Sequence, residues 1–271
     1  MSDVPMVQHP GPVSAERVVA IPCQATHRRV KLTAGLPLLQ AMTDAVGGAG
    51  AWFDLSDVPT KTLTFVRPAP ALDDHHVAWY SSETVLQDAT IRKAGAHLGR
   101  RDGEVFAHVH GLWSEENGTR HAGHLLAEKT FLSTDHTVDI WVMEGAMFET
   151  APDAETGFTL FRPVRTTPVG APNAVLGAIR PNEIIEEGIA KCAGKAGLPV
   201  AVVKGLGSLV GAQLEGETAL RDIATEVLLT DAEPESAIAV GFAGSPISGV
   251  MITGKNRVCV TFEVLLLLSP T

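Results

Sequence analysis

The sequence predicts an α+β fold with two similar lobes, each a mainly antiparallel sheet with one main helix. Both halves of the chain show the same order of elements, which is a strand, a helix, a strand, a glycine-bearing stretch and then further strands. Between the halves, residues 165–173 include Pro168, Gly170 and Pro172, a composition typical of a linker. We therefore expect two separate lobes that superpose on each other.

The first half opens with an extended, proline-bearing arm over residues 1–16. Its helix is the clearest element, because Pro37 stands near the start, Leu38, Met42 and Val46 recur at helical spacing, and Gly47 ends the run. Runs rich in β-branched and apolar residues predict strands over residues 17–25, 28–32, 51–55, 62–66, 77–81, 85–95, 105–113, 120–126, 137–147 and 157–162.

The second half repeats this order after the linker. A helix is expected to open at Pro181, to carry Ile185 and Ile189, and to end at Gly197. The run GLGSLVG resembles a dinucleotide-binding fingerprint, but it leads into a strand instead of a helix, so we do not assign it that role. Strands are predicted over residues 176–180, 200–204, 223–229, 237–242, 248–253 and 257–267.

The net charge of −10 argues against a nucleic-acid partner. Up to Pro163 there are 13 Lys and Arg against 20 Asp and Glu, and from Val164 there are 8 against 11. Binding to a phosphate backbone needs a basic stripe, and neither half offers one. Nucleic acid is therefore disfavoured as a partner.

The chain shows no membrane or secretion signal. Its longest apolar run, residues 264–268, is far too short for a membrane span. The N-terminus lacks a basic segment followed by an apolar one, so a cytoplasmic location and no membrane partner are expected. Cys23, Cys192 and Cys259 are odd in number and widely spaced, which favours buried thiols over disulfides or a Cys-x-x-Cys metal site.

Four of the ten histidines lie in one probable hairpin, residues 102–129. His108 and His110 are two apart on a strand and so point to the same face. A two-residue turn at Asn117 would pair His124 with Gly111, on the opposite face from the other two. A three-residue loop over residues 116–118 would instead place His124 opposite His110. We favour the second register, because burying imidazoles is favourable only if they share a partner. His121 has the opposite parity and is left out of the cluster.

Three neutral imidazoles on one rigid hairpin suit a divalent transition metal, zinc first in this donor set, with at least one position open. An H-x-H pair is also common on the solvent-exposed face of a sheet, so the pair alone is a weak signal for a metal. A third histidine, His124, on the neighbouring strand strengthens it. We predict a metal site formed by His108, His110 and His124. No histidine follows His136, so the second half is expected to be structural.

The residues DGEVFAHVHGLW followed by AGHLL resemble the signature of the PPC (plants and prokaryotes conserved) domain, in which an H-x-H strand precedes a GGHL strand. Arg180-Pro181, VVKGLGSL and VTFEV resemble further landmarks of the same domain, here in the second half. The resemblance implies two tandem copies, over residues 15–163 and 164–271, the second degenerate. It also implies a sheet of about seven strands with one helix in each copy, assembly as a homotrimer, and a metal at the three histidines.

The sequence departs from this family at several positions. Ala122 replaces the first glycine of GGHL, and Ala127-Glu128 replaces the glycine that usually follows. The RGRP core through which plant members bind DNA is absent from the sequence.

Three functions remain open on this evidence. The first is a metal-dependent protein that binds or transforms a small molecule at an open His₃ site, which leaves undecided whether it is an enzyme. Glu128, Arg92 and Glu149 are neighbours that could supply further groups, although surface roles are more ordinary for such residues. The second is an oligomeric interaction module with a structural metal. The third is a DNA-binding regulator, which the acidity opposes.

Overall fold

The computed structural model describes residues 5–197, 199–230 and 236–268, and it corrects the predicted fold class. Its described residues are mainly β-strands with two α-helices, and sixteen of the strands form one continuous sheet. The prediction of two separate α+β lobes is therefore wrong. No described helix is long and apolar enough to cross a membrane. The first four residues of the predicted arm lie outside the described part.

The helices are α1 (Leu38–Val46) and α2 (Ile185–Gly194), with a 3₁₀ turn η1 (Ala127–Lys129). The strands of the first half are β1 (Val18–Leu32), β2 (Ala51–Val66), β3 (Pro68–Ala69), β4 (Trp79–Tyr80), β5 (Thr84–Gln87), β6 (Thr90–Arg101), β7 (Glu104–Ser114), β8 (Arg120–Leu125), β9 (Phe131–Leu132), β10 (His136–Glu144), β11 (Ala146–Pro152) and β12 (Thr159–Arg165). The strands of the second half are β13 (Ala174–Ile179), β14 (Val200–Leu209), β15 (Thr225–Leu229), β16 (Ser236–Val240), β17 (Pro246–Val250) and β18 (Val258–Leu268).

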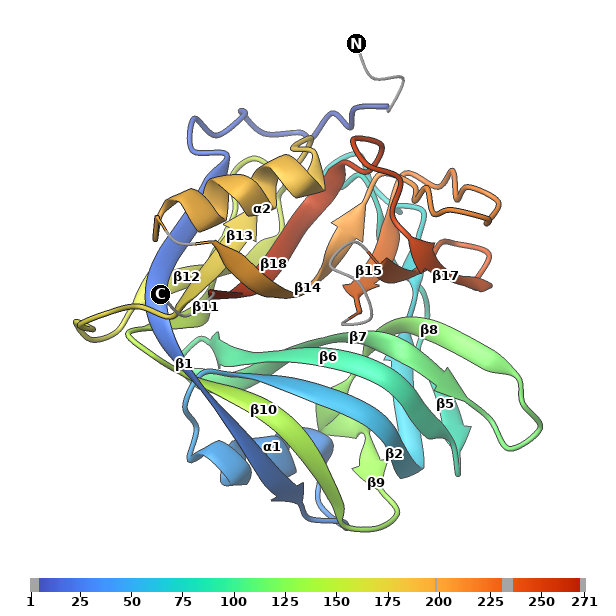
Figure 1. The fold of residues 1–271 in the computed structure, drawn as a ribbon. Coiled ribbons are helices and arrows are strands. Elements are labelled where there is room, and N and C mark those ends of the chain that lie inside the picture. The colour runs from blue at the N-terminus through green and yellow to red at the C-terminus, as the bar shows by residue number, and fades with distance from the viewer. Residues whose placement is uncertain (1–4, 198, 231–235, 269–271) are drawn as a thin grey trace.

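Strand β1 joins the two halves into one sheet. Its first part, from Val18 to Cys23, pairs with β13, and its second part, from Gln24 to Leu32, pairs with β10. Figure 1 shows this strand running from the upper strands of the molecule to the lower ones. A single 15-residue strand thus forms hydrogen-bonded ladders with both halves, and the sheet continues from one half into the other.

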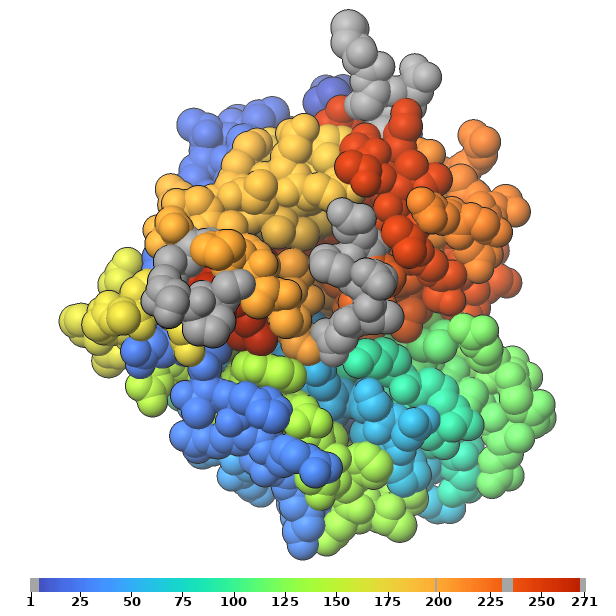
Figure 2. All heavy atoms as spheres, viewed as in Figure 1, coloured from blue at the N-terminus to red at the C-terminus, as the bar shows by residue number. Residues whose placement is uncertain are grey.

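The sheet folds back on itself, so that its two halves face each other. Strand β14 lies against β6, β15 against β7 and β16 against β8. Between them lies an apolar cluster that draws on both halves, with Trp52 from one side and Leu206 and Leu265 from the other. In the space-filling view the chain's green and cyan residues fill the lower side and its orange and red residues the upper side (Figure 2). Polar groups buried at this contact need partners from the opposite half.

Each helix covers an outer face, and each forms for a local reason. Helix α1 buries Leu38, Ala41 and Met42, which are spaced three and four apart, and it ends at Gly47 in the left-handed conformation with φ 61°. Helix α2 buries Ile185, Gly188 and Cys192 against the second half. It begins four residues later than Pro181, where the sequence suggested its start.

The two halves share an order of neighbouring strands. Counting outward from β1, the successive partners are β10, β2, β6, β7 and β8, and counting from β13 they are β18, β14, β15, β16 and β17. The division into residues 15–163 and 164–271 stays a prediction. Its boundary falls inside β12.

Candidate metal centre

The hairpin of β7 and β8 has the register that the sequence analysis favoured. His110 pairs with His124, and the backbone N–H groups of Glu115 and Gly118 donate to the carbonyls of Thr119 and Glu115. The loop is therefore the three residues 116–118, with Gly118 at φ 85°, a left-handed value that glycine adopts without strain. The predicted pairing is confirmed, and His124 shares a face with the H-x-H pair.

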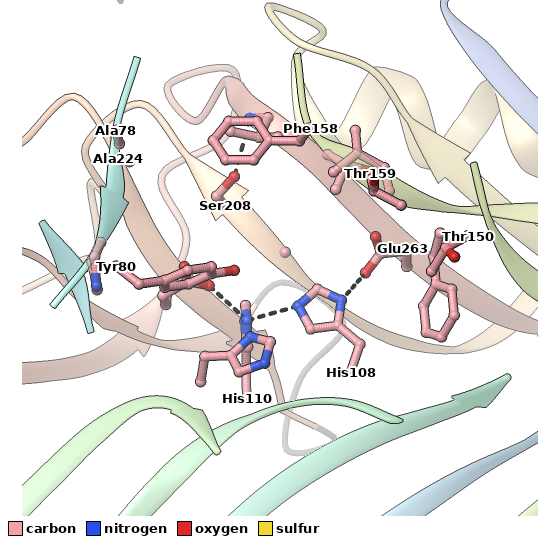
Figure 3. Close-up of a pocket in the computed structure, with 18 of the residues that line it drawn as sticks. Ala78, Tyr80, His108, His110, Thr150, Phe158, Thr159, Ser208, Ala224 and Glu263 are labelled. Atoms are coloured by element: carbon pink, nitrogen blue, oxygen red, sulfur yellow. Dashed lines mark hydrogen bonds and ion pairs between the residues drawn. The ribbon is translucent and has the colours of Figure 1, made fainter. Parts of the chain in front are cut away.

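The structure brings the three predicted histidines together between the two halves of the sheet. One ring nitrogen from each lies within 4.8 Å of the others, and Nε2 of His108 is 3.0 Å from Nε2 of His110. His110 is only 1% exposed and His124 only 8%. Figure 3 shows His108 and His110 side by side at one wall of a cavity.

Two carboxylates from the second half complete the cluster. Oε2 of Glu263, on β18, lies 2.6 Å from Nδ1 of His108, and Oε2 of Glu226, on β15, lies 2.6 Å from Nε2 of His110. The second half therefore contributes side chains to the histidine cluster, which the sequence analysis did not predict. The signal that could have identified both residues is a lone glutamate inside an otherwise apolar strand, as in VTFEVLLLL and TEVLL.

Hydrogen bonds behind the rings fix which nitrogen faces the shared centre. Nδ1 of His110 donates to the carbonyl of Val227 at 3.0 Å, which leaves Nε2 as the nitrogen that faces the cluster. Nδ1 of His108 faces Glu263, so its Nε2 also points inward. A carboxylate or carbonyl behind a histidine is the usual way in which a metal ligand is oriented. Nδ1 of His124 is buried without a hydrogen-bond partner in the described part of the chain.

Burial decides the protonation of this cluster. It lowers the pKa of His108 and His124 well below the usual value, and the neighbouring imidazoles lower it further. Burial also disfavours charge on His110, but the charge and hydrogen bond of Glu226 outweigh it and raise the pKa of His110. Burial raises the pKa of Glu263 to about 8. Two of the three imidazoles are thus neutral, which is the form in which histidine binds a metal.

The histidines line a cavity of about 510 Å³ that both halves enclose. Its walls include Trp79 and Tyr80 from β4, Phe158 from the segment before β12, and Ser208 from β14. This volume is within the usual range for a small-molecule site. The other residues that the sequence suggested do not line it, since Glu128, Arg92 and Glu149 are all exposed elsewhere.

Similarity to known proteins is confined to structure. No family model matches the sequence, and no curated protein matches it either. Solved structures of similar fold cover about half of the chain.

A protein titled metal-containing, from Archaeoglobus fulgidus, is 17% identical with a TM-score of 0.42 and covers 53% of this chain and 98% of its own. A PPC protein from Pyrococcus horikoshii is 17% identical with a TM-score of 0.39 and covers 57% of this chain and 100% of its own. A protein from Bacteroides thetaiotaomicron, provisionally titled DNA-binding, is 10% identical with a TM-score of 0.38 and covers 52% and 98%. Likenesses at this level do not transfer a function.

Proposed function

We propose that this protein binds one divalent transition metal ion, zinc in the first instance, through His108, His110 and His124, and that the adjoining cavity receives a small molecule. The observation that carries the proposal is the convergence of three imidazole nitrogens within 4.8 Å at a cavity wall. Such a donor set is typical of zinc sites that keep a position open.

The surrounding residues fit a metal better than they fit a purely structural cluster. Burying three imidazoles and two carboxyl groups between two sheets is unfavourable unless all of them are paired. The unpartnered Nδ1 of His124 leaves this cluster unsatisfied without a further ligand. Glu226 lies 2.6 Å from Nε2 of His110, so this nitrogen would exchange its ion pair for the metal when an ion binds.

A bound ion would supply Lewis acidity toward a carbonyl or carboxyl oxygen of a molecule in the cavity. The residues of the chain would position the ligands: Glu263 would orient His108, and the carbonyl of Val227 would orient His110. Trp79, Tyr80 and Phe158 would offer aromatic surface to the bound molecule. This division of roles supports a site that binds or transforms a small molecule over an interaction module with a closed structural metal.

Elemental analysis of tag-free protein tests the proposal. We expect about one equivalent of a transition metal per chain, lost on chelation and restored by titration with Zn²⁺ followed by calorimetry. His124→Ala should abolish stoichiometric binding. His121→Ala is the matched control, because His121 lies on the same hairpin but bonds Glu115 at 2.8 Å outside the cavity lining. Wild-type protein that neither contains nor takes up a metal would refute the proposal.

A further inference from the structure

Arg101, the last residue of β6, stands beside the metal centre without an acidic partner. Its guanidinium carbon lies 3.7 Å from the centroid of the Phe106 ring, and the side chain lines the cavity. No ion pair of Arg101 occurs within the described ranges, whereas Arg92 on the same strand pairs with Asp57. A guanidinium that lies over an aromatic ring can still use its N–H groups to bind a ligand.

An aromatic wall lies elsewhere on the same cavity. The ring of His76 is 4.6 Å from both the Trp79 and the Phe158 rings, and Trp79 and Phe158 stack at 5.7 Å with an interplanar angle of 23°. Figure 3 shows Phe158 across the cavity from His110. Trp79 keeps 41% of its surface exposed although it is large and apolar. A planar apolar group bound there would cover this surface.

The charges of the cavity select the ligand's head group. Among the described residues that line the cavity, Arg101 is the only arginine or lysine, and Asp102, Glu226 and Glu263 line the cavity with it. A neutral ligand would leave the guanidinium edge unpaired, and a doubly charged phosphate would meet too many carboxyl groups. A single carboxylate matches both the charge and the fork geometry of a guanidinium.

We infer that the cavity binds a small monocarboxylate with a planar apolar body, in which Arg101 holds the carboxylate and Trp79 and Phe158 cover the body. The inference rests on the proposed function for the cavity's role as a small-molecule site. Arg101 and the aromatic wall belong to the chain whether or not an ion is bound, so this subsite can be tested with and without metal.

Benzoate is the probe, and calorimetry on metal-free and zinc-loaded protein is the measurement. Arg101→Gln should weaken benzoate binding about tenfold or more, as expected for one charge-assisted hydrogen-bonded pair. Arg101→Lys should give an intermediate loss, because it keeps the charge but not the fork. Arg120→Gln, an exposed arginine on β8 outside the cavity, is the matched control and should bind like the wild type. Trp79→Ala should weaken benzoate a few-fold.

Benzamide and phenyl phosphate complete the test. Both should bind wild-type protein more weakly than benzoate does, and neither should respond to Arg101→Gln as strongly. Equal binding of benzamide, unchanged affinity in Arg101→Gln, or no benzoate binding at all would each overturn the inference. Metal content measured on the same samples separates the two claims. Metal-loaded protein without Arg101-dependent binding refutes only the subsite. Wild-type protein that takes up no metal on titration with Zn²⁺ but binds benzoate through Arg101 refutes only the metal.

Discussion

Glu263→Gln should weaken metal binding while leaving the fold intact. Glu263 is 1% exposed and lies 2.6 Å from Nδ1 of His108, so it holds that ring with Nε2 directed at the centre. Glutamine has nearly the same shape but cannot form a carboxylate, and its amide can present N–H groups to Nδ1, which favours the wrong tautomer of the imidazole. The substitution therefore perturbs the orientation of one ligand without removing any ligand.

The expected loss of affinity is about 10- to 100-fold, the usual effect of removing a residue that orients a metal ligand. This corresponds to about 1.4 to 2.7 kcal/mol of binding free energy. Competition with a chromophoric chelator at fixed pH measures the dissociation constant, and thermal unfolding of the metal-free proteins checks the fold. Glu187→Gln, on the exposed face of α2, is the matched control and should leave the affinity unchanged. A dissociation constant for Glu263→Gln within twofold of the wild-type value would refute this account of His108.

Three further predictions follow from the structure. His110→Ala should lower metal content to background and destabilise the metal-free protein by about 1–3 kcal/mol, because it leaves the buried carboxylate of Glu226 without a partner; elemental analysis and urea unfolding check both parts. Burial alone would raise the pKa of Asp153, but hydrogen bonds from the backbone of Thr156 and from Arg180 lower it. The ionised Asp153 therefore stabilises the fold at a pH above the usual carboxyl pKa, and this stabilisation is lost as the pH falls through the lowered pKa. In urea titrations, Asp153→Asn should therefore cost about 3 kcal/mol at pH near 6 and clearly less at pH near 3, and an equal cost at both would contradict the assignment. The protein should not bind duplex DNA at physiological salt, given its net charge of −10, and a salt-sensitive shift in fluorescence anisotropy at micromolar protein would show otherwise.

The local part of the site could be predicted from the sequence because short-range geometry determines it. Strand parity places His108 and His110 on one face, and a left-handed glycine at Gly118 sets the loop length that brings His124 opposite His110. Neither relation depends on the rest of the fold. The aromatic wall could not be predicted, since Trp79 on β4 and Phe158 in the segment before β12 are distant in sequence.

The long-range part could not be predicted, because it depends on how the sheet folds over. Glu263 is 155 residues from His108, and no periodicity connects them. The error in fold class has the same origin. Residues 17–25 and 28–32 are predicted as strand, but their sequence does not show that they form one strand in which Val18 pairs with Ile179 and Val30 with Val138. A strand's partners are set by the packing of its faces, which local sequence does not record.

The histidine cluster lowers the stability of the protein, and a bound ligand would offset this cost. Five ionisable side chains meet between two sheet faces, where apolar residues would pack without an electrostatic cost. The ion pairs of Glu263 and Glu226 with the histidines reduce the free-energy cost of burying these groups but do not remove it. Nδ1 of His124 is buried and unpaired within the described residues, so the penalty is not fully offset by the protein alone. Positions at which a sequence departs from the requirements of a stable core are where functional sites are expected. The same reasoning applies to the guanidinium of Arg101, which has no ion pair among the described residues, and to the exposed ring of Trp79, and all three features line the cavity that we propose binds a small molecule.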